Sequence, residues 1–227
     1  KEMIYAKLCN QATLLRRNVG QTEQAQRLRA LARQATSAEN IYQLFGAEGE
    51  GASFYFSVFG ELIKPRAVEK YGFDWKGRIG RGAKDEINIL LNYAYGMLTA
   101  ECVRAIVACG LDPHAGVLHS SNRNKPALAL DLMEEFRPLV ADSAIIGMLN
   151  KLAFPLNGFH RSGVTMRLSD EGRKAVIRSV ESRLEEEFTH PVFGYKISWR
   201  RTIEVQARMI LGVIDGSQPN YKGMVTR

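Results

Sequence analysis

Apolar residues recur at helical spacing along most of this chain. The longest stripe lies in residues 85–109 and consists of Ile87, Leu90, Leu91, Ala94, Leu98, Cys102, Ala105, Ile106 and Cys109. Residues three and four apart share one face of a helix, so this stripe predicts a central buried helix that Gly110 and Pro113 end. Similar spacings predict helices over residues 1–35, with a break near Gly20, and over 127–138, 144–154, 169–188 and 198–214.

Two shorter elements complete the predicted fold. Thr36 and Glu39 have the spacing of a capping box, which predicts a short helix that Gly46 ends. Residues 157–169 are rich in turn-forming residues and predict one short β-hairpin around Met166 and Leu168. The pattern therefore predicts an all-α, multi-helix domain with one short hairpin.

The composition describes a basic protein with enough apolar residues for a sizeable core. Hydrophobic residues make up 45% of the 227 residues, and 31 lysines and arginines against 24 acids give a net charge of +7. This balance favours a polyanionic partner, with nucleic acid as the leading candidate. The outer face of residues 1–35 carries arginines that either contact phosphate or are simply solvated, namely Arg16, Arg17, Arg27, Arg29 and Arg33.

Cysteine usage and hydropathy predict a cytoplasmic protein. Cys9, Cys102 and Cys109 are too few and too scattered for a disulfide framework, and no pair has zinc-binding spacing. No apolar run approaches the length of about 18 residues that a membrane span needs, and no signal-peptide pattern opens the chain. We therefore expect a soluble, cytoplasmic protein that does not act at a membrane.

A histidine and two carboxylates stand out in residues 110–138. His119 precedes a polar, basic loop, and the helix after it carries Asp131 and Glu134 on one face, because they are three residues apart. Carboxylates in an otherwise apolar helix are costly to bury unless a cation or donor meets them. An imidazole with carboxylate oxygens suits Mg²⁺ or Mn²⁺ at a phosphate site better than structural zinc. The alternative is that Glu134 belongs to a solvated face and that His119 is an ordinary loop residue.

Two further segments carry candidate chemistry. Glycines on both sides of Glu48 leave room for a large ligand beside its carboxylate; alternatively, Glu48 is an acid at a helix N-terminus. Residues 64–84 mix basic and aromatic side chains. This mixture suits a DNA strand through phosphate contact and stacking, or it describes a flexible surface loop.

Four segments together resemble a known family. Residues 110–119 read GLDPHAGVLH, and residues 128–138 read LALDLMEEFRP. Residues 88–98 match the pattern NxLLxxxYxxL, and residues 46–56, GAEGEGASFYF, resemble the pattern GxEGxAxxYF. These patterns are similar to those of the helical catalytic domain of the CRISPR-associated spacer integrase, the first of the CRISPR-associated protein families. The similarity covers almost the whole chain.

The resemblance implies a metal-dependent site. It implies that Glu48, His119 and Glu134 hold Mg²⁺ or Mn²⁺ and that Asp131 has a supporting catalytic role. Arg78 and Arg81 match the arginine-rich loop of the family, although Gly82 and Ala83 replace its two prolines. We expect this loop, with Lys84, to contact DNA.

The resemblance also implies an organisation and partners. Residues 1–35 correspond to basic connecting helices and residues 36–227 to the catalytic core. The chain begins at Lys1 and lacks the small N-terminal β domain of the family, so we expect a fragment. The implied partners are double-stranded DNA, as prespacer and as CRISPR repeat, a dimer of the second CRISPR-associated protein, and a second copy of this chain in a homodimer. The fourth CRISPR-associated protein, separate or fused upstream, is a further implied partner.

The implied reaction joins the 3′-hydroxyl ends of a prespacer to the repeat array by transesterification. Because one phosphodiester replaces another, no nucleotide cofactor is needed, and the chain contains neither a phosphate-binding GxxxxGK[ST] loop nor a strand-bound GxGxxG motif. The alternatives are a metal-dependent DNA endonuclease, a transposon-type integrase and a non-catalytic DNA-binding module. The residues themselves do not separate strand transfer from hydrolysis.

Overall fold

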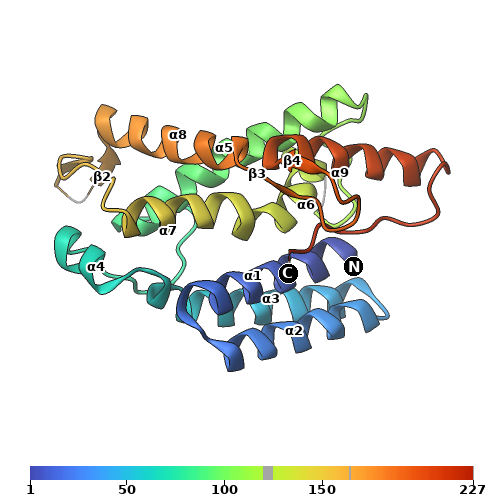
Figure 1. Ribbon diagram of the computed structural model, residues 1–227, viewed down its shortest axis with the longest axis horizontal. Helices are drawn as coiled ribbons and strands as arrows, with labels where there is room; N and C mark the ends of the chain where they lie inside the picture. The colour runs from blue at the N-terminus through green and yellow to red at the C-terminus, as the bar shows by residue number, and fades with distance from the viewer. Residues whose placement is uncertain (120–124, 164, 227) are drawn as a thin grey trace.

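The computed structural model, which describes residues 1–119, 125–163 and 165–226, places its helices in two tiers (Figure 1). The lower tier contains α1 (Glu2–Val19), α2 (Thr22–Ser37) and α3 (Ile41–Val58). The upper tier contains α5 (Glu86–Ala108), α6 (Ala127–Phe136), α7 (Ser143–Asn150), α8 (Asp170–Glu185) and α9 (Trp199–Ile214). This arrangement confirms the predicted all-α class.

The remaining elements are short. η1 (Phe59–Leu62) and α4 (Pro65–Tyr71) follow α3, and the π-helical turn η2 (Arg137–Asp142) joins α6 to α7. The predicted hairpin is confirmed as β1 (Phe159–Ser162) paired with β2 (Thr165–Leu168), while residue 164 lies outside the described residues. A second hairpin, β3 (Glu187–Thr189) with β4 (Lys196–Ser198), was not predicted, because three-residue strands carry too little alternation to be recognised.

The predicted short helix before Gly46 is wrong. Asn40 caps α3 by accepting a hydrogen bond from the Gln43 amide at 3.0 Å, whereas the Thr36 hydroxyl donates back to Arg33 within α2. The helix then continues through its glycines to Val58, because its buried face packs against α1 and α2. That packing offsets the cost of about 1 kcal/mol for each interior glycine. Glu48 is consequently in the middle of a helix, which excludes the helix N-terminal alternative.

Pro138 does not end the helix that contains Asp131. The chain widens into η2 at this proline and continues directly into α7. Asp142, at the end of η2, is buried and accepts hydrogen bonds from the hydroxyls of Tyr55 at 2.9 Å and Tyr95 at 2.6 Å. Burial raises the pKa of Asp142 to about 6, although both tyrosine donors oppose this shift. These bonds tie α3 and α5 to η2.

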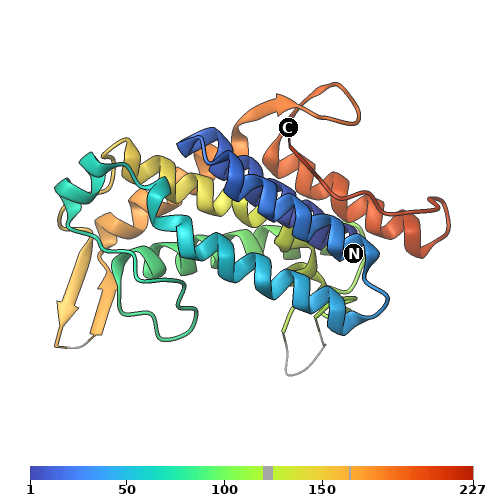
Figure 2. The ribbon, with the colours of Figure 1, turned by 90° about the horizontal axis from the view of Figure 1, so that it is seen from below.

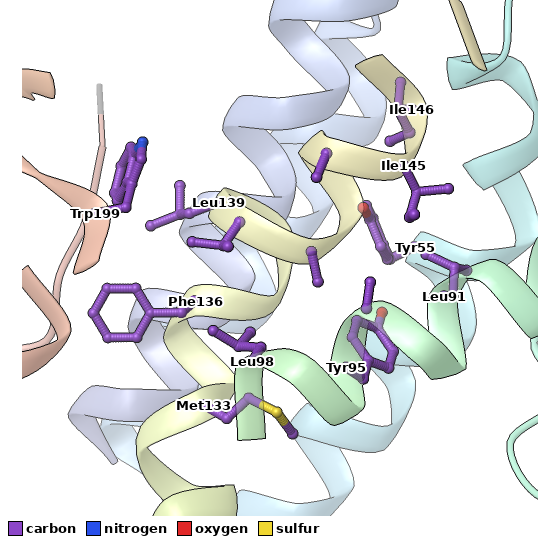
Figure 3. Packing of buried hydrophobic residues seen from close by; sticks show 14 of the residues in the cluster. Tyr55, Leu91, Tyr95, Leu98, Met133, Phe136, Leu139, Ile145, Ile146 and Trp199 are labelled. Atoms are coloured by element: carbon purple, nitrogen blue, oxygen red, sulfur yellow. The ribbon is translucent and has the colours of Figure 1, made fainter. Parts of the chain in front are cut away.

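One hydrophobic core joins both tiers. Its side chains come from elements along the chain, from Ile4 in α1 to Met224 near the end of the described residues. Figure 3 shows part of this core, where Tyr55 and Tyr95 face η2 and Phe136 lies towards Trp199. None of the helices in the described part of the chain is both long and apolar enough to cross a membrane.

The position of α1 is the feature of the fold that matters most for the site. Figure 2 shows α1 in the middle of the molecule, with the last residues of the chain running back beside it. The Asn10 side chain fastens these residues by donating to the Met224 carbonyl at 2.8 Å and accepting from the Thr226 amide at 3.0 Å. α1 is therefore held from several sides, and its polar residues have defined positions.

Candidate active site

Close packing of α1 on α3 creates the first half of the site. A Cβ atom placed on Gly51 would lie 2.2 Å from Cδ2 of Leu8, so a larger residue here would force the buried Leu8 side chain to move. The approach brings Lys7, one residue before Leu8, against Glu48, one turn before Gly51. The Lys7 ammonium forms an ion pair with Oε1 of Glu48.

The same ammonium reaches a second carboxylate, from α6. Nζ of Lys7 lies 2.6 Å from Oε2 of Glu134. The Lys7 and Glu134 side chains are 5% and 4% exposed, whereas that of Glu48 is 26% exposed. Two carboxylates from different helices thus converge on one buried cation, at a position that opens to solvent on the Glu48 side.

Arg137 is the second cationic partner of Glu134. Its Nη2 atom lies 2.9 Å from Oε1 of Glu134, and its guanidinium lies 5.1 Å from the centre of the Tyr95 ring. Burial would raise the pKa of Glu134, but the charges of Lys7 and Arg137 outweigh burial and hold this pKa below its ordinary value. Glu134 is therefore a carboxylate at neutral pH despite its burial.

The loop before α6 positions His119. A Cβ atom on Gly116 would lie 2.5 Å from Cβ of Ala127, so glycine lets the loop rest on the first turn of α6. Oδ2 of Asp131 accepts hydrogen bonds from the amides of Val117 at 2.6 Å and Leu118 at 2.8 Å. Oδ1 of Asp131 accepts from the His119 amide at 2.9 Å. Asp131 thereby fixes the backbone that carries the imidazole.

Asp131 also contacts the imidazole itself. Nδ1 of His119 lies 2.6 Å from Oδ1 of Asp131. This hydrogen bond raises the pKa of His119, while partial burial acts in the opposite direction. With Nδ1 donating to Asp131, the lone pair of the neutral ring is on Nε2, as in many metal-binding histidines that a carboxylate orients.

The structure brings the predicted site residues into one neighbourhood. The charge of Glu134 contributes to the raised pKa of His119, and that of His119 helps to lower the pKa of Glu134. Asp131 and Glu134 are both buried in α6, but Asp131 binds the His119 loop whereas Glu134 faces Lys7 and Arg137. The alternative of a solvated face for Glu134 is thereby excluded.

These residues fit a divalent cation, although among the described residues no three His, Cys, Asp or Glu side chains form a ready-made cluster. The Lys7 ammonium shows where a positive charge is held between Glu48 and Glu134. Oε2 of Glu134 is buried and close to Nζ, yet the contact lacks hydrogen-bond geometry, so this oxygen has only an ionic partner. Two carboxylates and an imidazole nitrogen form a donor set that Mg²⁺ and Mn²⁺ accept.

The three predicted DNA-binding residues have different environments. Arg78 turns inward, donates to the side chains of Asn88 at 2.9 Å and Asn92 at 2.6 Å, and lies over the Tyr95 ring. It holds the loop against α5. Arg81 and Lys84 are exposed on the same loop, so they remain the predicted DNA contacts.

Lys7 and Arg137 are the site residues that the sequence analysis did not assign. For Lys7 there was a usable signal, because it lies between Ile4 and Gln11 at helical spacing and so falls on the buried face of α1. A lysine on such a face needs a buried anion as its partner. For Arg137, the position one turn after Glu134 indicated an ion pair on the same helix.

Comparisons with known proteins identify the family of this chain. The family model described as CRISPR associated protein Cas1 matches residues 1–182. The CRISPR-associated exonuclease Cas4/endonuclease Cas1 fusion of Geobacter sulfurreducens is 41% identical over 235 aligned residues, which cover 100% of this chain and 42% of that protein. The predicted family resemblance is therefore confirmed.

Solved structures share the fold. A casposase bound to integration product superposes with a TM-score of 0.82 at 25% identity, over 97% of this chain and 61% of that chain. The Cas6-RT-Cas1–Cas2 complex superposes with a TM-score of 0.81 at 22% identity, over 98% of this chain and 24% of that one. This chain thus spans only part of each of these proteins. Because the family model covers most of its residues, the chain belongs to the CRISPR associated protein Cas1 family.

Proposed function

We propose that this chain catalyses metal-dependent DNA strand transfer, in which the 3′-hydroxyl ends of a prespacer are joined to a CRISPR repeat. The observation that carries the proposal is the convergence of Glu48 and Glu134 on one cation position beside His119, whose ring Asp131 orients. In this proposal Glu48, His119 and Glu134 hold Mg²⁺ or Mn²⁺. A divalent cation, when bound, stabilises negative charge on the phosphoryl group that reacts.

The reaction exchanges one phosphodiester bond for another. A bond forms between the incoming 3′-oxygen and phosphorus, and the bond from phosphorus to the 3′-oxygen of the target strand breaks. The incoming hydroxyl loses a proton, and the released hydroxyl gains one. Lys7 and Arg137 add positive charge where the anionic DNA backbone must approach, and the Asp131 carboxylate keeps His119 in its orientation.

Hydrolysis is the second candidate reaction. The Geobacter relative is named an endonuclease, and water in place of the 3′-hydroxyl would give cleavage by the same residues. Exposed Arg81 and Lys84 serve as proposed DNA contacts in either reaction.

We extend the proposal to partners. The Geobacter relative is a fusion with the exonuclease Cas4, and the Cas6-RT-Cas1–Cas2 complex contains Cas2. By analogy we propose that this chain works as a homodimer on double-stranded DNA with a Cas2 dimer, and with a Cas4 protein that is separate or fused.

A strand-transfer assay tests this function. Labelled duplex DNA with free 3′-hydroxyl ends is mixed with a supercoiled plasmid that carries repeats, with Mg²⁺, Mn²⁺ or EDTA, and with the chain alone or together with Cas2. We expect label to be joined to plasmid only when metal is present. Nicked plasmid without joined label would instead assign the hydrolytic reaction. Metal-independent DNA binding without any reaction, even with Cas2, would support a DNA-binding module.

A further inference from the structure

Lys7 occupies an unusual position for a lysine. Its ammonium is buried in the middle of the molecule and contacts both Glu48 and Glu134, the two carboxylates of the proposed metal site. A lysine carries one charge at the end of a flexible four-carbon stem, so its ammonium can move further than its backbone does. A divalent cation bound at this position would compete with Lys7 for the same two carboxylates.

The charges around Lys7 indicate which group its ammonium would bind after displacement. Without metal, Lys7 and Arg137 balance the two carboxylates, so the centre of the site is close to neutral. Addition of a divalent cation would leave an excess of positive charge. An ammonium released from Glu48 and Glu134 would then pair best with an anionic group, and the phosphodiester of the substrate is the anion that has to enter.

We propose that Lys7 is an internal counter-ion that closes the Glu48–Glu134 pair in the absence of a divalent cation and, when displaced, binds the phosphate of the DNA substrate. This inference rests on the proposed function. It makes metal binding weaker in the free protein and couples it to DNA binding, because each ligand changes the charge that the other meets.

Mn²⁺ titration calorimetry without DNA tests the first half of the proposal. Lys7→Met removes the competing charge, and Lys7→Gln does so while keeping a polar end group. We expect both variants to bind Mn²⁺ at least about 10-fold more tightly than the wild type, which corresponds to about 1.4 kcal/mol. Lys174→Met, at an exposed lysine of α8, is the matched control and should bind as the wild type does.

Two further measurements guard against a folding defect and test the second half. Mn²⁺ should raise the melting temperature of the Lys7 variants more than that of the wild type. In the presence of Mn²⁺, both variants should bind a DNA duplex that ends in 3′-deoxy nucleotides more weakly than the wild type. Equal or weaker Mn²⁺ binding by both Lys7 variants would overturn the Lys7 proposal alone. If no protein bound Mn²⁺, the metal-dependent function itself would fail.

A second and independent inference concerns the other side of α1. A pocket of about 400 Å³ lies between α1, α2 and the last residues of the described chain, and Tyr5, Cys9 and Thr13 contribute to its wall. Three arginines from two helices also line it, namely Arg16, Arg29 and Arg33. Lys7 and Cys9 are two residues apart, which is more than half a turn, so this pocket faces away from the candidate active site.

The positive charges in this pocket have no acidic partner among the residues that the structure describes. No ion pair within residues 1–119, 125–163 and 165–226 involves these three arginines, whereas Arg27, on the same helix as two of them, pairs with Glu50 at 3.5 Å. Glu2 is an acid that interacts electrostatically with two side chains of the pocket wall, Tyr5 and Cys9. Like charges held together in a concave surface repel one another, and a bound anion would remove this repulsion.

We infer that this pocket binds phosphate groups of a DNA backbone at a distance from the reacting ends. The net charge of +7 and the proposed reaction on DNA favour a polyanion over a small anion. On this proposal the arginines of the first two helices form a phosphate-binding group, Arg16, Arg29 and Arg33, and a group with interactions elsewhere in the protein, Arg17 and Arg27.

The salt dependence of DNA binding tests this inference. Each phosphate contact contributes about 0.9 to the slope of log affinity against log salt concentration for duplex DNA. The triple variant Arg16→Gln, Arg29→Gln, Arg33→Gln should therefore lower this slope by about 2–3. The control, Arg173→Gln, Arg201→Gln, Arg208→Gln, makes the same change in net charge at exposed arginines of α8 and α9. Equal slopes for the two triple variants, or inhibition of DNA binding by micromolar inorganic phosphate, would contradict the assignment.

Discussion

His119→Ala is expected to reduce the yield of joined DNA at least about 100-fold, or about 2.7 kcal/mol in activation free energy, while the fold is retained. Alanine removes the imidazole whose Nε2 is directed to the proposed metal by the Nδ1 contact with Asp131. The His119 side chain is 36% exposed and lies at the edge of the core, so its loss leaves little cavity. The measurement is the initial rate of strand transfer in Mn²⁺, with the melting temperature as a test of folding.

His160→Ala is the matched control for this experiment. His160 is exposed on β1 and belongs to the hairpin rather than to the site. We expect this variant to join DNA at the rate of the wild type. Wild-type activity of His119→Ala in an otherwise responsive assay would remove His119 from the proposed metal ligands.

Asp131→Asn is expected to weaken Mn²⁺ binding about 10-fold to 100-fold, which is the usual cost of removing a carboxylate that orients a metal-binding histidine. An asparagine keeps one acceptor oxygen but loses the charge, whereas Asp131 accepts from three backbone amides and from the His119 ring. We also expect a loss of about 1–3 kcal/mol in the free energy of unfolding, because a buried amide nitrogen would face donors.

Two measurements separate these effects of Asp131→Asn. Calorimetric titration with Mn²⁺ gives the affinity, and urea denaturation without metal gives the stability. Asp112→Asn is the control in the same loop, because Asp112 is exposed and its carboxylate accepts only from the His114 amide among the described contacts. A loss of stability in Asp131→Asn without any change in Mn²⁺ affinity would show that Asp131 supports the loop but not the metal site.

The residues of the proposed metal site come from different helices. Glu48, Glu134 and the loop with His119 come from α3, α6 and the segment before α6, and the core fixes these elements against α1. Asp142 also helps to hold these helices together, because its two tyrosine partners belong to α3 and α5. A site that must hold one cation against a bulky polyanion benefits from such fixed supports.

Local sequence patterns predicted much of the fold because they act over a few residues. The apolar spacing of α5 and the helix start at Ser169 depend on residues within one or two turns of each other, and the structure contains both. Where local rules conflicted with packing, they failed. Gly46 was predicted to end a helix, yet α3 continues through it to Val58 because the buried face of α3 packs against α1 and α2.

The same distinction between local pattern and tertiary packing applies to the candidate site. By itself the sequence determined the family resemblance, the helical class and the positions of Glu48, His119, Asp131 and Glu134 as candidates, because motifs and spacing are properties of the linear chain. Only the tertiary structure shows that Asp131 forms a hydrogen bond with His119 and that Arg78 turns inward to Asn88. It also shows that Lys7 lies between the carboxylates of Glu48 and Glu134. Lys7 and Glu48 are 41 residues apart, and their contact depends on how closely α1 packs on α3, which no local pattern specifies.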